Sequence, residues 1–341
     1  MLQEIEFEHP FIYINILHIS TIMPELSKAL QRFYPRPSPL QPLVGNFLEQ
    51  YGLEVLIKRD DLIDPALSGN KWRKLHLNLL EAERLEASTL LTFGGAYSNH
   101  IYAVAAAGQG FGFQTIGMIR GEQPKTFGAT LRFAESCGMV FRFLSRTDYR
   151  NKNIPTDIDM DGTYLIPEGG TNCLGVKGCA SIVTEVQEQL SGEAAIDYWC
   201  TSSGTGGTAA GIINQLQGQS QVLVFSSLKG DFLQGDIEQL LQKCTYTSWT
   251  NWQLMTEYHF GGYAKFKPEL IEFMDAFKKQ TGIALDPVYT GKMVYGIVDL
   301  AAKGFFKKGS RILIVHTGGL QGMAGFYEQR KQNRNGNRNR N

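Results

Sequence analysis

The chain contains 341 residues, of which 43% are hydrophobic, so it can bury a substantial core in one large domain or in two of ordinary size. Its 33 basic and 33 acidic side chains cancel, and no overall field attracts nucleic acid or an anionic membrane surface. No run of about 18 apolar residues occurs, as a membrane-spanning helix would need. We therefore expect a small-molecule partner, with neither nucleic acid nor membrane bound.

The cysteines and the first residues indicate where the protein works. Five cysteines are present, and none forms a Cys-x-x-Cys pair or a Cys/His cluster at metal-ligand spacing. They are Cys137, Cys173, Cys179, Cys200 and Cys244. We interpret them as reduced thiols and expect no metal. Residues 1–10 hold three glutamates and lack the basic start and apolar run of a secretion signal, so we expect a cytoplasmic protein.

The predicted elements begin after a proline-rich arm. From Pro35 to Pro42 the proline density permits extended chain but not helix. Short apolar runs then alternate with segments of helical periodicity, which favours parallel strands joined by right-handed crossovers. The pattern predicts strand 55–57, helix 72–86, strand 89–93, helix 99–108, strand 114–119, helix 128–136 and strand 139–143.

A polar stretch over residues 145–162 is predicted as a surface loop, and a second alternating series begins near Tyr164. This series comprises helix 176–190, strand 198–201, a helix from 208, strand 221–225, helices 232–242, 268–279 and 292–303, strand 311–315 and a closing helix from 320. The sequence thus predicts an α/β fold of two open twisted parallel-sheet domains with helices on both faces. We expect a large domain over 1–73 and 164–330, a smaller inserted domain over 74–163, and a disordered Asn/Arg/Gly tail over 331–341.

Lys71 is the first candidate for chemistry. It lies in Ser68-Gly69-Asn70-Lys71-Trp72-Arg73-Lys74, a turn of small residues that leads into a helix. Taken alone, such a lysine is more often an ordinary surface charge. Its significance depends on the motifs that accompany it.

The second candidate is the segment 202–208, with the sequence Ser-Ser-Gly-Thr-Gly-Gly-Thr, which follows an apolar strand and opens a helix. Glycines allow backbone amides to converge on an anion, hydroxyls add donors, and the helix N-terminus carries partial positive charge. The segment lacks the Gly-Lys-Ser/Thr ending of an ATP-binding loop and the acidic ribose anchor of a dinucleotide site. A single phosphate ester is the best-matched ligand, although a turn without a ligand remains an alternative.

The third candidate is the turn 93–100, with the sequence Phe-Gly-Gly-Ala-Tyr-Ser-Asn-His, again between a strand and a helix. Its exposed amides and short polar side chains could receive a carboxylate. A structural explanation exists for Ser98, because serine before a helix caps the orphan amides. The two roles are compatible.

In this order, five motifs resemble those of the tryptophan-synthase-β-like, fold type II PLP enzymes, in the branch of aminocyclopropane-carboxylate deaminase and D-cysteine desulfhydrase. They are Gly-Asn-Lys-x-Arg-Lys, Gly-Gly-x-x-Ser-Asn-His, Thr-Gly-Gly-Thr, Asp-Pro-Val-Tyr-Thr-Gly-Lys and His-Thr-Gly-Gly. The resemblance runs from about Ser38 to Phe326. It implies the tryptophan synthase β-like fold with the cofactor in the large domain, pyridoxal 5'-phosphate, a small amino-acid substrate and a homodimer.

The resemblance also implies roles for single residues. Lys71 would form the internal aldimine, and Asn99 would hydrogen-bond the ring hydroxyl. Ser98 would bind the substrate carboxylate or transfer protons, while Tyr263 and Tyr289 would flank the reacting carbons as hydroxyl acids or bases. The implied phosphate ligands are Lys74, Ser202, Thr205, Gly206, Gly207 and Thr208.

Thr290 bears on which reaction occurs. In this family the residue after the motif tyrosine is glutamate in the cyclopropane-opening deaminases and threonine in the desulfhydrases, and this chain has Tyr289-Thr290. A carboxylate facing the pyridine nitrogen strengthens the electron sink, and a hydroxyl does so far less. Aminocyclopropane-carboxylate has no α-hydrogen, so its ring opening demands the stronger sink. Thr290, seconded by Thr317, therefore favours β-elimination from D-cysteine or a related β-substituted D-amino acid, giving pyruvate, ammonia and the leaving group.

Three alternatives stay open at this point. The chain could be an aminocyclopropane-carboxylate deaminase that forms 2-oxobutyrate and ammonia. It could be an inactive PLP-binding homologue, although the joint presence of Lys71, Ser98 and the phosphate segment weighs against this. An ATP- or dinucleotide-dependent enzyme would need a motif lysine that segment 202–208 lacks. The leaving group is also open, because sulfide, sulfite and chloride could each depart from the same carbanion.

Overall fold

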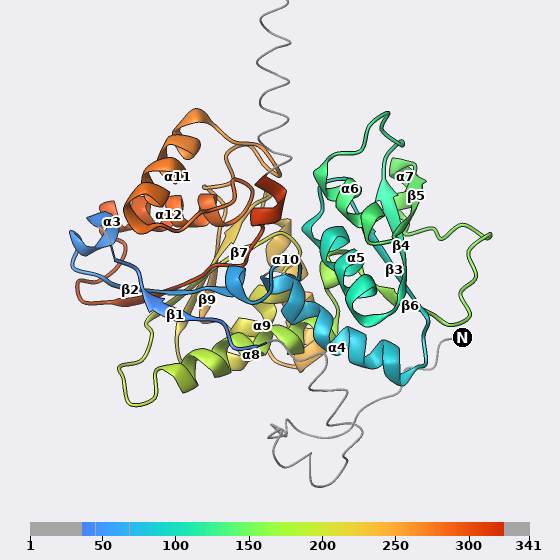
Figure 1. The fold of residues 1–341 in the computed structure, drawn as a ribbon. Helices are drawn as coiled ribbons and strands as arrows, with labels where there is room; N and C mark the ends of the chain where they lie inside the picture. The colour runs from blue at the N-terminus through green and yellow to red at the C-terminus, as the bar shows by residue number, and fades with distance from the viewer. Residues whose placement is uncertain (1–35, 45, 68, 324–341) are drawn as a thin grey trace, which may run out of the picture. The chain divides into compact units, whose positions relative to one another are not determined.

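A computed structural model describes residues 36–44, 46–67 and 69–323 (Figure 1). The described residues all belong to one compact unit. The predicted disordered tail, 331–341, lies outside the described residues. Among the residues that the structure describes, no helix is long and apolar enough to cross a membrane.

Two sheets form the framework, as the sequence predicts. The larger has six strands in the order β1-β2-β10-β7-β8-β9, and all its pairings are parallel except β1 with β2. The smaller has the order β5-β4-β3-β6 and is parallel throughout. The strands are β1 (Leu40–Pro42), β2 (Glu54–Lys58), β3 (Thr89–Gly94), β4 (Gln114–Arg120), β5 (Val140–Leu144), β6 (Thr163–Ile166), β7 (Tyr198–Ser203), β8 (Gln221–Ser226), β9 (Trp252–Met255) and β10 (Arg311–Val315).

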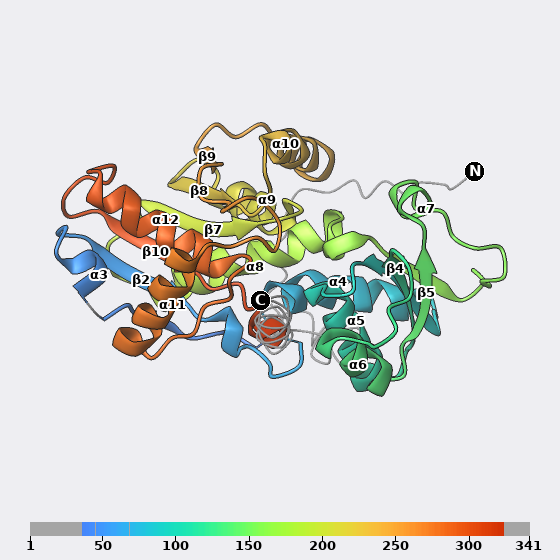
Figure 2. The same cartoon turned by 90° about the horizontal axis from the view of Figure 1, so that it is seen from above.

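Helices cover the sheets, and their arrangement can be followed in two views (Figures 1 and 2). The α-helices are α3 (Asn46–Glu49), α4 (Asn70–Arg84), α5 (Asn99–Phe111), α6 (Ala129–Ser136), α7 (Arg146–Arg150), α8 (Cys173–Gln189), α9 (Gly207–Leu216), α10 (Phe232–Thr245), α11 (Pro268–Thr281) and α12 (Thr290–Ala302). Short 3-10 helices are η1 (Asp60–Leu62), η2 (Glu168–Gly170) and η3 (Leu320–Gly322). The sequence does not predict α7, which lies within the expected loop 145–162, or the four-residue strand β9.

The large sheet separates two hydrophobic cores because successive strand residues point to opposite faces. Ile312 and Ile314 of β10 pack with α11 and α12, whereas Leu313 and Val315 pack with α8, α9 and α10. Strand β10 is buried throughout. The continuous apolar run of β10 fits a central parallel strand, which is covered on both faces. The predicted helices on both faces of the sheet are confirmed.

Strand β6 spans one of the predicted domain boundaries. Thr163 to Ile166 pair with Thr89 to Thr92 of β3, so β6 is an edge of the smaller sheet. The expected start of the large domain at residue 164 therefore falls inside a strand of the other sheet. A four-residue strand carries too little pattern to show which sheet it joins, and the division into domains remains a prediction.

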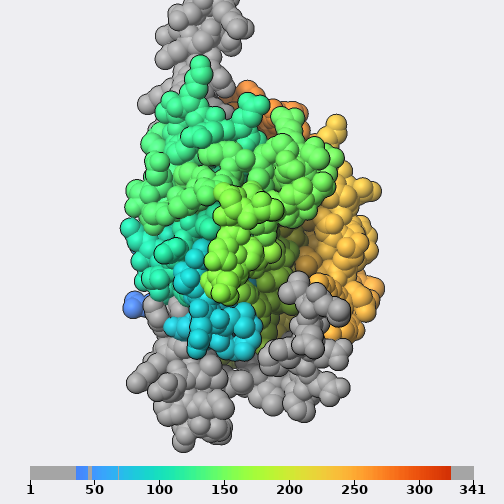
Figure 3. Space-filling model, turned by 90° about the vertical axis from the view of Figure 1, so that its right-hand side faces the viewer, coloured from blue at the N-terminus to red at the C-terminus, as the bar shows by residue number. Residues whose placement is uncertain are grey.

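Helix α4 connects the parts of the molecule that matter for function. It packs on α8 of the large-sheet part and on α5 of the small-sheet part, and α8 also packs on α10. Figure 3 shows α8, in yellow-green, between the green small-sheet residues and α10, in gold. The first turn of α4 carries Lys71 and Lys74, so whatever fixes that turn also positions both amines.

A buried ion cluster fixes the first turn of α4. Arg73 is fully buried and donates two hydrogen bonds of 2.7 Å to Asp60 and bonds of 2.6 and 2.9 Å to Glu185 of α8. Lys58 of β2 lies 2.8 Å from Glu185. Burial opposes the charged form, yet the two carboxylates raise the pKa of Arg73 further above its ordinary value. Arg73 stands inside the Gly-Asn-Lys-x-Arg-Lys motif, but its role in this cluster was not predicted from the sequence.

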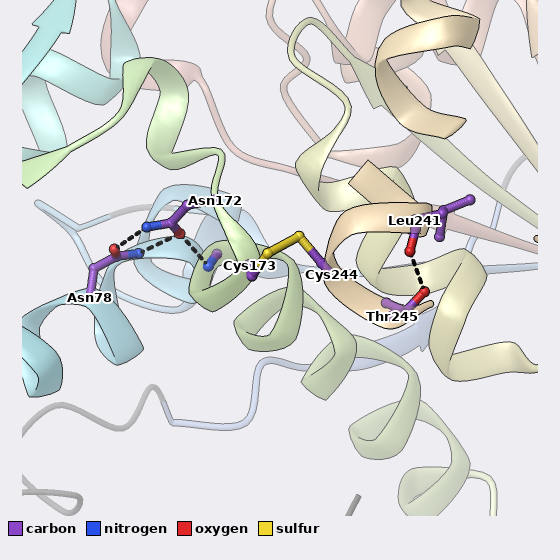
Figure 4. The surroundings of a disulfide bond; sticks show 7 residues. Asn78, Asn172, Cys173, Leu241, Cys244 and Thr245 are labelled. Atoms are coloured by element: carbon purple, nitrogen blue, oxygen red, sulfur yellow. Dashed lines mark hydrogen bonds between the residues drawn. A yellow bond between two sulfur atoms is a disulfide. The ribbon is translucent and has the colours of Figure 1, made fainter. Parts of the chain in front are cut away.

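A disulfide joins Cys173, the first residue of α8, to Cys244 near the end of α10 (Figure 4). The interpretation of all five cysteines as reduced thiols is therefore wrong for this pair. The two cysteines are 71 positions apart in sequence, and only the packing of α10 on α8 brings their Cα atoms to 5.0 Å. Cys137, Cys179 and Cys200 are free thiols.

Replacing Arg73 by Met should lower the free energy of unfolding by about 3–5 kcal/mol, because it leaves Asp60 and Glu185 buried without their main counter-charge. Urea unfolding of the cofactor-free protein measures this loss. Arg84→Ala is the matched control on the same helix, since the Arg84 side chain is 55% exposed and pairs with Glu81 at the surface. The control should lower the free energy of unfolding far less, because its ion pair is exposed to water, and equal losses in the two variants would contradict the cluster's importance.

Candidate active site

A cavity of about 640 Å³ lies where the carboxyl ends of several parallel strands meet. Loops after β3, β7 and β10 contribute to its wall, as is usual for ligand sites in open α/β sheets. The structure gathers here all but two of the residues that the sequence analysis singles out, and the exceptions are Gly207 and Thr290. The predicted residues on the wall are Lys71, Lys74, Ser98, Asn99, Ser202, Thr205, Gly206, Thr208, Tyr263, Tyr289 and Thr317.

The turn between β7 and α9 presents unpaired backbone amides. Helix α9 starts at Gly207 without a side-chain cap, so its first N–H groups have no partner within the helix. Gly206 adopts a left-handed conformation with φ of 80°, and a Cβ there would approach Ile237 of α10 to 2.9 Å. Glycine is therefore required at 206 on two counts. Such a helix start suits an anion.

Lys74 points to the same place. Its side chain is buried, with 2% of its surface exposed, and its Nζ donates to Gly169 O at 3.1 Å, Thr171 Oγ1 at 3.0 Å and Thr205 Oγ1 at 3.3 Å. All three acceptors are neutral, and burial lowers the pKa of Lys74. A Cβ on Gly207 would lie 3.0 Å from Nζ, so this glycine makes room for the ammonium beside the helix start. A phosphate group fits this combination of cation, hydroxyls and amides.

Lys71 lies one helical turn away, and its amine is tuned by its surroundings. Burial and then the charge of Lys74 lower the pKa of Lys71 to about 7, against a smaller opposing effect of Asp286. Asn70 accepts from Lys71 Nζ at 3.0 Å through Oδ1 and donates to Thr208 Oγ1 at 2.9 Å through Nδ2. Asn70 thus ties the amine to the phosphate turn. This bridging role of Asn70 was not predicted from the sequence, although its place in the Gly-Asn-Lys motif marked it as a candidate site residue.

Ser98 and His100 shape the turn after β3. Ser98 caps α5, because its Oγ accepts from the amides of His100 at 3.2 Å and Ile101 at 3.3 Å. The expected capping role is therefore confirmed, and Ser98 still lines the cavity. Thr92 Oγ1 donates to Ile166 O, so Nε2 of His100 must donate to Thr92. Burial and the charges of Lys71 and Lys74 hold the pKa of His100 well below its usual value, which keeps this cavity-lining imidazole neutral.

Tyr263 and Tyr289 stand together on the cavity wall. Their ring centroids are 6.1 Å apart in an edge-to-face arrangement. Burial and then the neighbouring Tyr263 hold the pKa of Tyr289 well above 10, and burial also raises the pKa of Tyr263. Both phenols therefore keep their protons at neutral pH and can donate hydrogen bonds or protons.

Thr290 does not line the cavity. It is fully buried, and its hydroxyl donates to Asp286 Oδ2 at 2.6 Å. Asp286 also accepts from the amides of Val288, Tyr289 and Thr290, so its carboxylate is saturated by the start of α12. Thr317 does line the cavity, and its Oγ1 lies 3.2 Å from Ser202 Oγ. Of the two threonines predicted to face the cofactor ring, Thr317 is the one that lines the cavity.

Comparison with known proteins agrees with this geometry. The family model for pyridoxal-phosphate-dependent enzymes matches residues 32–318. The chain belongs to this family. Pyridoxal phosphate is accordingly the cofactor, and the buried, unbalanced cation of Lys74 beside the amides of α9 is where its phosphate fits. Lys71 would hold its aldehyde end.

Two relatives and one solved structure show how near the similarity is. Proteins named "Putative 1-aminocyclopropane-1-carboxylate deaminase" from Pyrococcus horikoshii and Thermotoga maritima are each 30% identical over 84% of this chain and over 91% and 95% of their own length. A crystal structure described as an ACC deaminase homologue superposes with a TM-score of 0.75 at 28% identity, covering 90% of this chain and 98% of that one. The predicted tryptophan synthase β-like family and fold are confirmed.

The tuned amine of Lys71 can be tested without cofactor. Because the pKa of Lys71 is lowered to about 7, its amine loses its proton as the pH rises through that value, about three units before an ordinary lysine does. Acetylation of the cofactor-free protein, quantified by peptide mass spectrometry, should show a midpoint near pH 7 for Lys71. Exposed lysines in the same digest are the internal control.

Lys74→Met should raise that midpoint, because it removes a neighbouring positive charge that disfavours protonation of Lys71. The same labelling experiment measures the change. A midpoint that stays constant or falls in Lys74→Met would show that the two amines are not coupled.

Proposed function

We propose that the protein is a lyase that eliminates the β-substituent of D-cysteine or a related β-substituted D-amino acid, giving pyruvate, ammonia and, from D-cysteine, sulfide. The observation that carries this proposal is the kind of group available to the pyridine nitrogen. Thr317 offers a hydroxyl on the cavity wall, whereas the carboxylate of Asp286 is saturated by its four donors. Glu168 is the one acidic side chain among the described residues of the cavity wall, and its carboxylate forms an ion pair with Lys152.

A hydroxyl at this position selects for the easier reaction. When bound, pyridoxal phosphate supplies an electron sink for negative charge at the substrate α-carbon, and the group facing the ring nitrogen sets how strong that sink is. β-Elimination needs only a moderate sink, because the leaving group departs as soon as the α-proton is removed. Opening a cyclopropane without an α-proton requires more. The environment of Thr317 therefore supports elimination.

The chain's own residues can supply the proton transfers. With a pKa of about 7, Lys71 is a suitable general base for the α-proton once the substrate amine has displaced it. Tyr289 and Tyr263 keep their protons and can donate one to the departing sulfur. The capped turn at Ser98 offers donors for the substrate carboxylate.

The second candidate is ring opening of 1-aminocyclopropane-1-carboxylate. It is favoured by the names of relatives that are 30% identical over most of this chain. The protein would then produce 2-oxobutyrate and ammonia and no sulfide.

Location and assembly are the finer parts of this proposal. We keep the homodimer and the cytoplasmic location as predictions. The disulfide Cys173–Cys244 bears on the second, because stable disulfides are rare in reducing compartments.

The products decide between the two reactions. Purified protein loaded with pyridoxal phosphate should release sulfide and pyruvate from D-cysteine, and 2-oxobutyrate from aminocyclopropane-carboxylate should stay at background. Sulfide and the two keto acids are measured separately. Lys71→Ala should abolish the release of sulfide and pyruvate, and formation of 2-oxobutyrate without sulfide by the wild type would overturn the proposal.

The two threonines can be separated by matched replacements with valine. Thr317→Val should lower kcat on the order of 10²-fold and shift the visible absorbance of the bound cofactor, because it removes a polar group facing the ring. Thr290→Val should leave the absorbance unchanged and instead cost about 1–3 kcal/mol of stability, because Asp286 loses a buried donor. The reverse pattern of effects would place Thr290, and not Thr317, at the ring.

A further inference from the structure

The disulfide Cys173–Cys244 joins the two elements that flank the phosphate-binding turn. Cys173 begins α8, two residues after Thr171, which contacts Lys74. Cys244 lies at the end of α10, one turn after Leu240. Figure 4 shows the bond spanning from the start of α8 to α10. The cross-link therefore lies between segments that both touch the turn 203–207.

On the α8 side, the chain before Cys173 holds part of the phosphate site. Thr171 Oγ1 lies 2.6 Å from Thr205 Oγ1 and accepts from Lys74 Nζ. Asn172 caps α8 by accepting from Gly175 N at 2.8 Å, and its Nδ2 donates to Asn78 of α4 at 2.7 Å. This segment is thus anchored to α4 whether or not the disulfide is present.

On the α10 side, the helix packs into the core beside α9 through the buried side chains of Leu233, Ile237 and Leu241. Ile237 and Leu240 back the turn, because a Cβ on Gly206 would lie 2.9 Å from Ile237 Cγ1 and 3.2 Å from Leu240 Cδ1. These two side chains prevent Gly206 from moving outward, away from the amides of α9. The position of α10 therefore controls how well the turn is formed.

A second cavity, open to the surface, lies beside this contact, between α10 and residues 171, 204 and 205. It has a volume of about 330 Å³, and its wall includes Thr171, Thr205, Leu240 and Lys243. Lys243 is adjacent to Cys244, so the disulfide lies at the edge of this cavity. Across this open cavity, the disulfide is a covalent link between the end of α10 and the segment that holds Thr171.

Both residues of the disulfide are partly exposed. Cys173 and Cys244 are half-buried, whereas Cys179 and Cys200 are fully buried. A thiolate of a low-molecular-weight thiol or of a protein dithiol can attack one sulfur, which forms a mixed disulfide and releases the other cysteine as a thiolate. A second thiol then releases the first cysteine, so two electrons pass to the protein and one disulfide of the reductant is formed.

We propose that Cys173 and Cys244 are a redox modification site that controls cofactor retention. The disulfide keeps α10 against Gly206 and so preserves the phosphate turn, and reduction by a thiol weakens binding at the phosphate end. The inference depends on the binding of pyridoxal phosphate, and it is independent of which amino acid the enzyme uses.

The test compares cofactor affinity in the two redox states. Cofactor-free protein is oxidised or reduced, its thiols are counted after denaturation, and pyridoxal phosphate is titrated by fluorescence and absorbance. Three thiols are expected in the oxidised form and five in the reduced form. Reduction should weaken the affinity about tenfold. Five thiols under every oxidising condition, or equal affinities in the two states, would overturn the proposal.

Matched ligands and variants localise the effect. Pyridoxal, which lacks the phosphate, should bind equally to both redox states, and an equal loss for pyridoxal would refute a phosphate-end effect. Cys244→Ser and Cys173→Ala should bind pyridoxal phosphate with the affinity of the reduced wild type, and adding reductant should not change that affinity. Cys137→Ser removes a free thiol that lines neither cavity. This variant should respond to reductant like the wild type. Variants at Cys173 or Cys244 that bind like the oxidised wild type would contradict the inference.

Linkage gives a readout that needs neither activity nor a variant. If reduction weakens cofactor binding tenfold, saturating pyridoxal phosphate must make the disulfide harder to reduce by the same factor. For this two-electron couple the reduction potential should fall by about 30 mV in a glutathione titration. A potential that is the same with and without cofactor would rule out the coupling.

Discussion

The buried ammonium group of Lys74 and the need to balance its charge organise the whole site. Its three acceptors are neutral oxygens, from Gly169, Thr171 and Thr205, so they solvate the cation without neutralising it. The start of α9 adds partial positive charge beside it. Burial lowers the pKa of Lys74, and an anion between these two electropositive groups would stabilise the charged form of the amine. The same charge helps to lower the pKa of Lys71, so phosphate binding and amine reactivity share one physical origin.

Helix α4 connects the two lysines of the site to the rest of the fold. Its first turn holds both amines, and Arg73 between them is fixed by Asp60 and Glu185 in a fully buried ion cluster. That cluster joins the loop after β2, α4 and α8, and α8 in turn contacts α10. A displacement of α8 would therefore move the first turn of α4 and the segment before Cys173 together.

Local pattern predicted the fold class, and the resemblance of five motifs to a known family supplied most of the cavity wall. Apolar runs separated by helical periodicity define parallel α/β units, and glycine turns after strands mark where a wall must form. Contacts between distant segments had no such signal. The disulfide of Cys173 with Cys244, the pairing of β6 with β3 and the cluster around Arg73 each join residues far apart in sequence. Asn70 was missed although its motif was recognised, because the motif does not show which atoms its amide bridges.

Thr290 illustrates why residue type at a motif position is weaker evidence than geometry. The Thr290 hydroxyl can donate one hydrogen bond, and it donates that bond to Asp286. The other acceptor sites of Asp286 are filled by backbone amides at the start of α12. That carboxylate acts as a helix cap, so its negative charge stabilises the helix start and does not serve the ring. The polar group that remains on the wall is the hydroxyl of Thr317, held near Ser202. The proposal of elimination over ring opening therefore depends on how α12 is capped, and Thr290 bears on it indirectly by keeping Asp286 in that role.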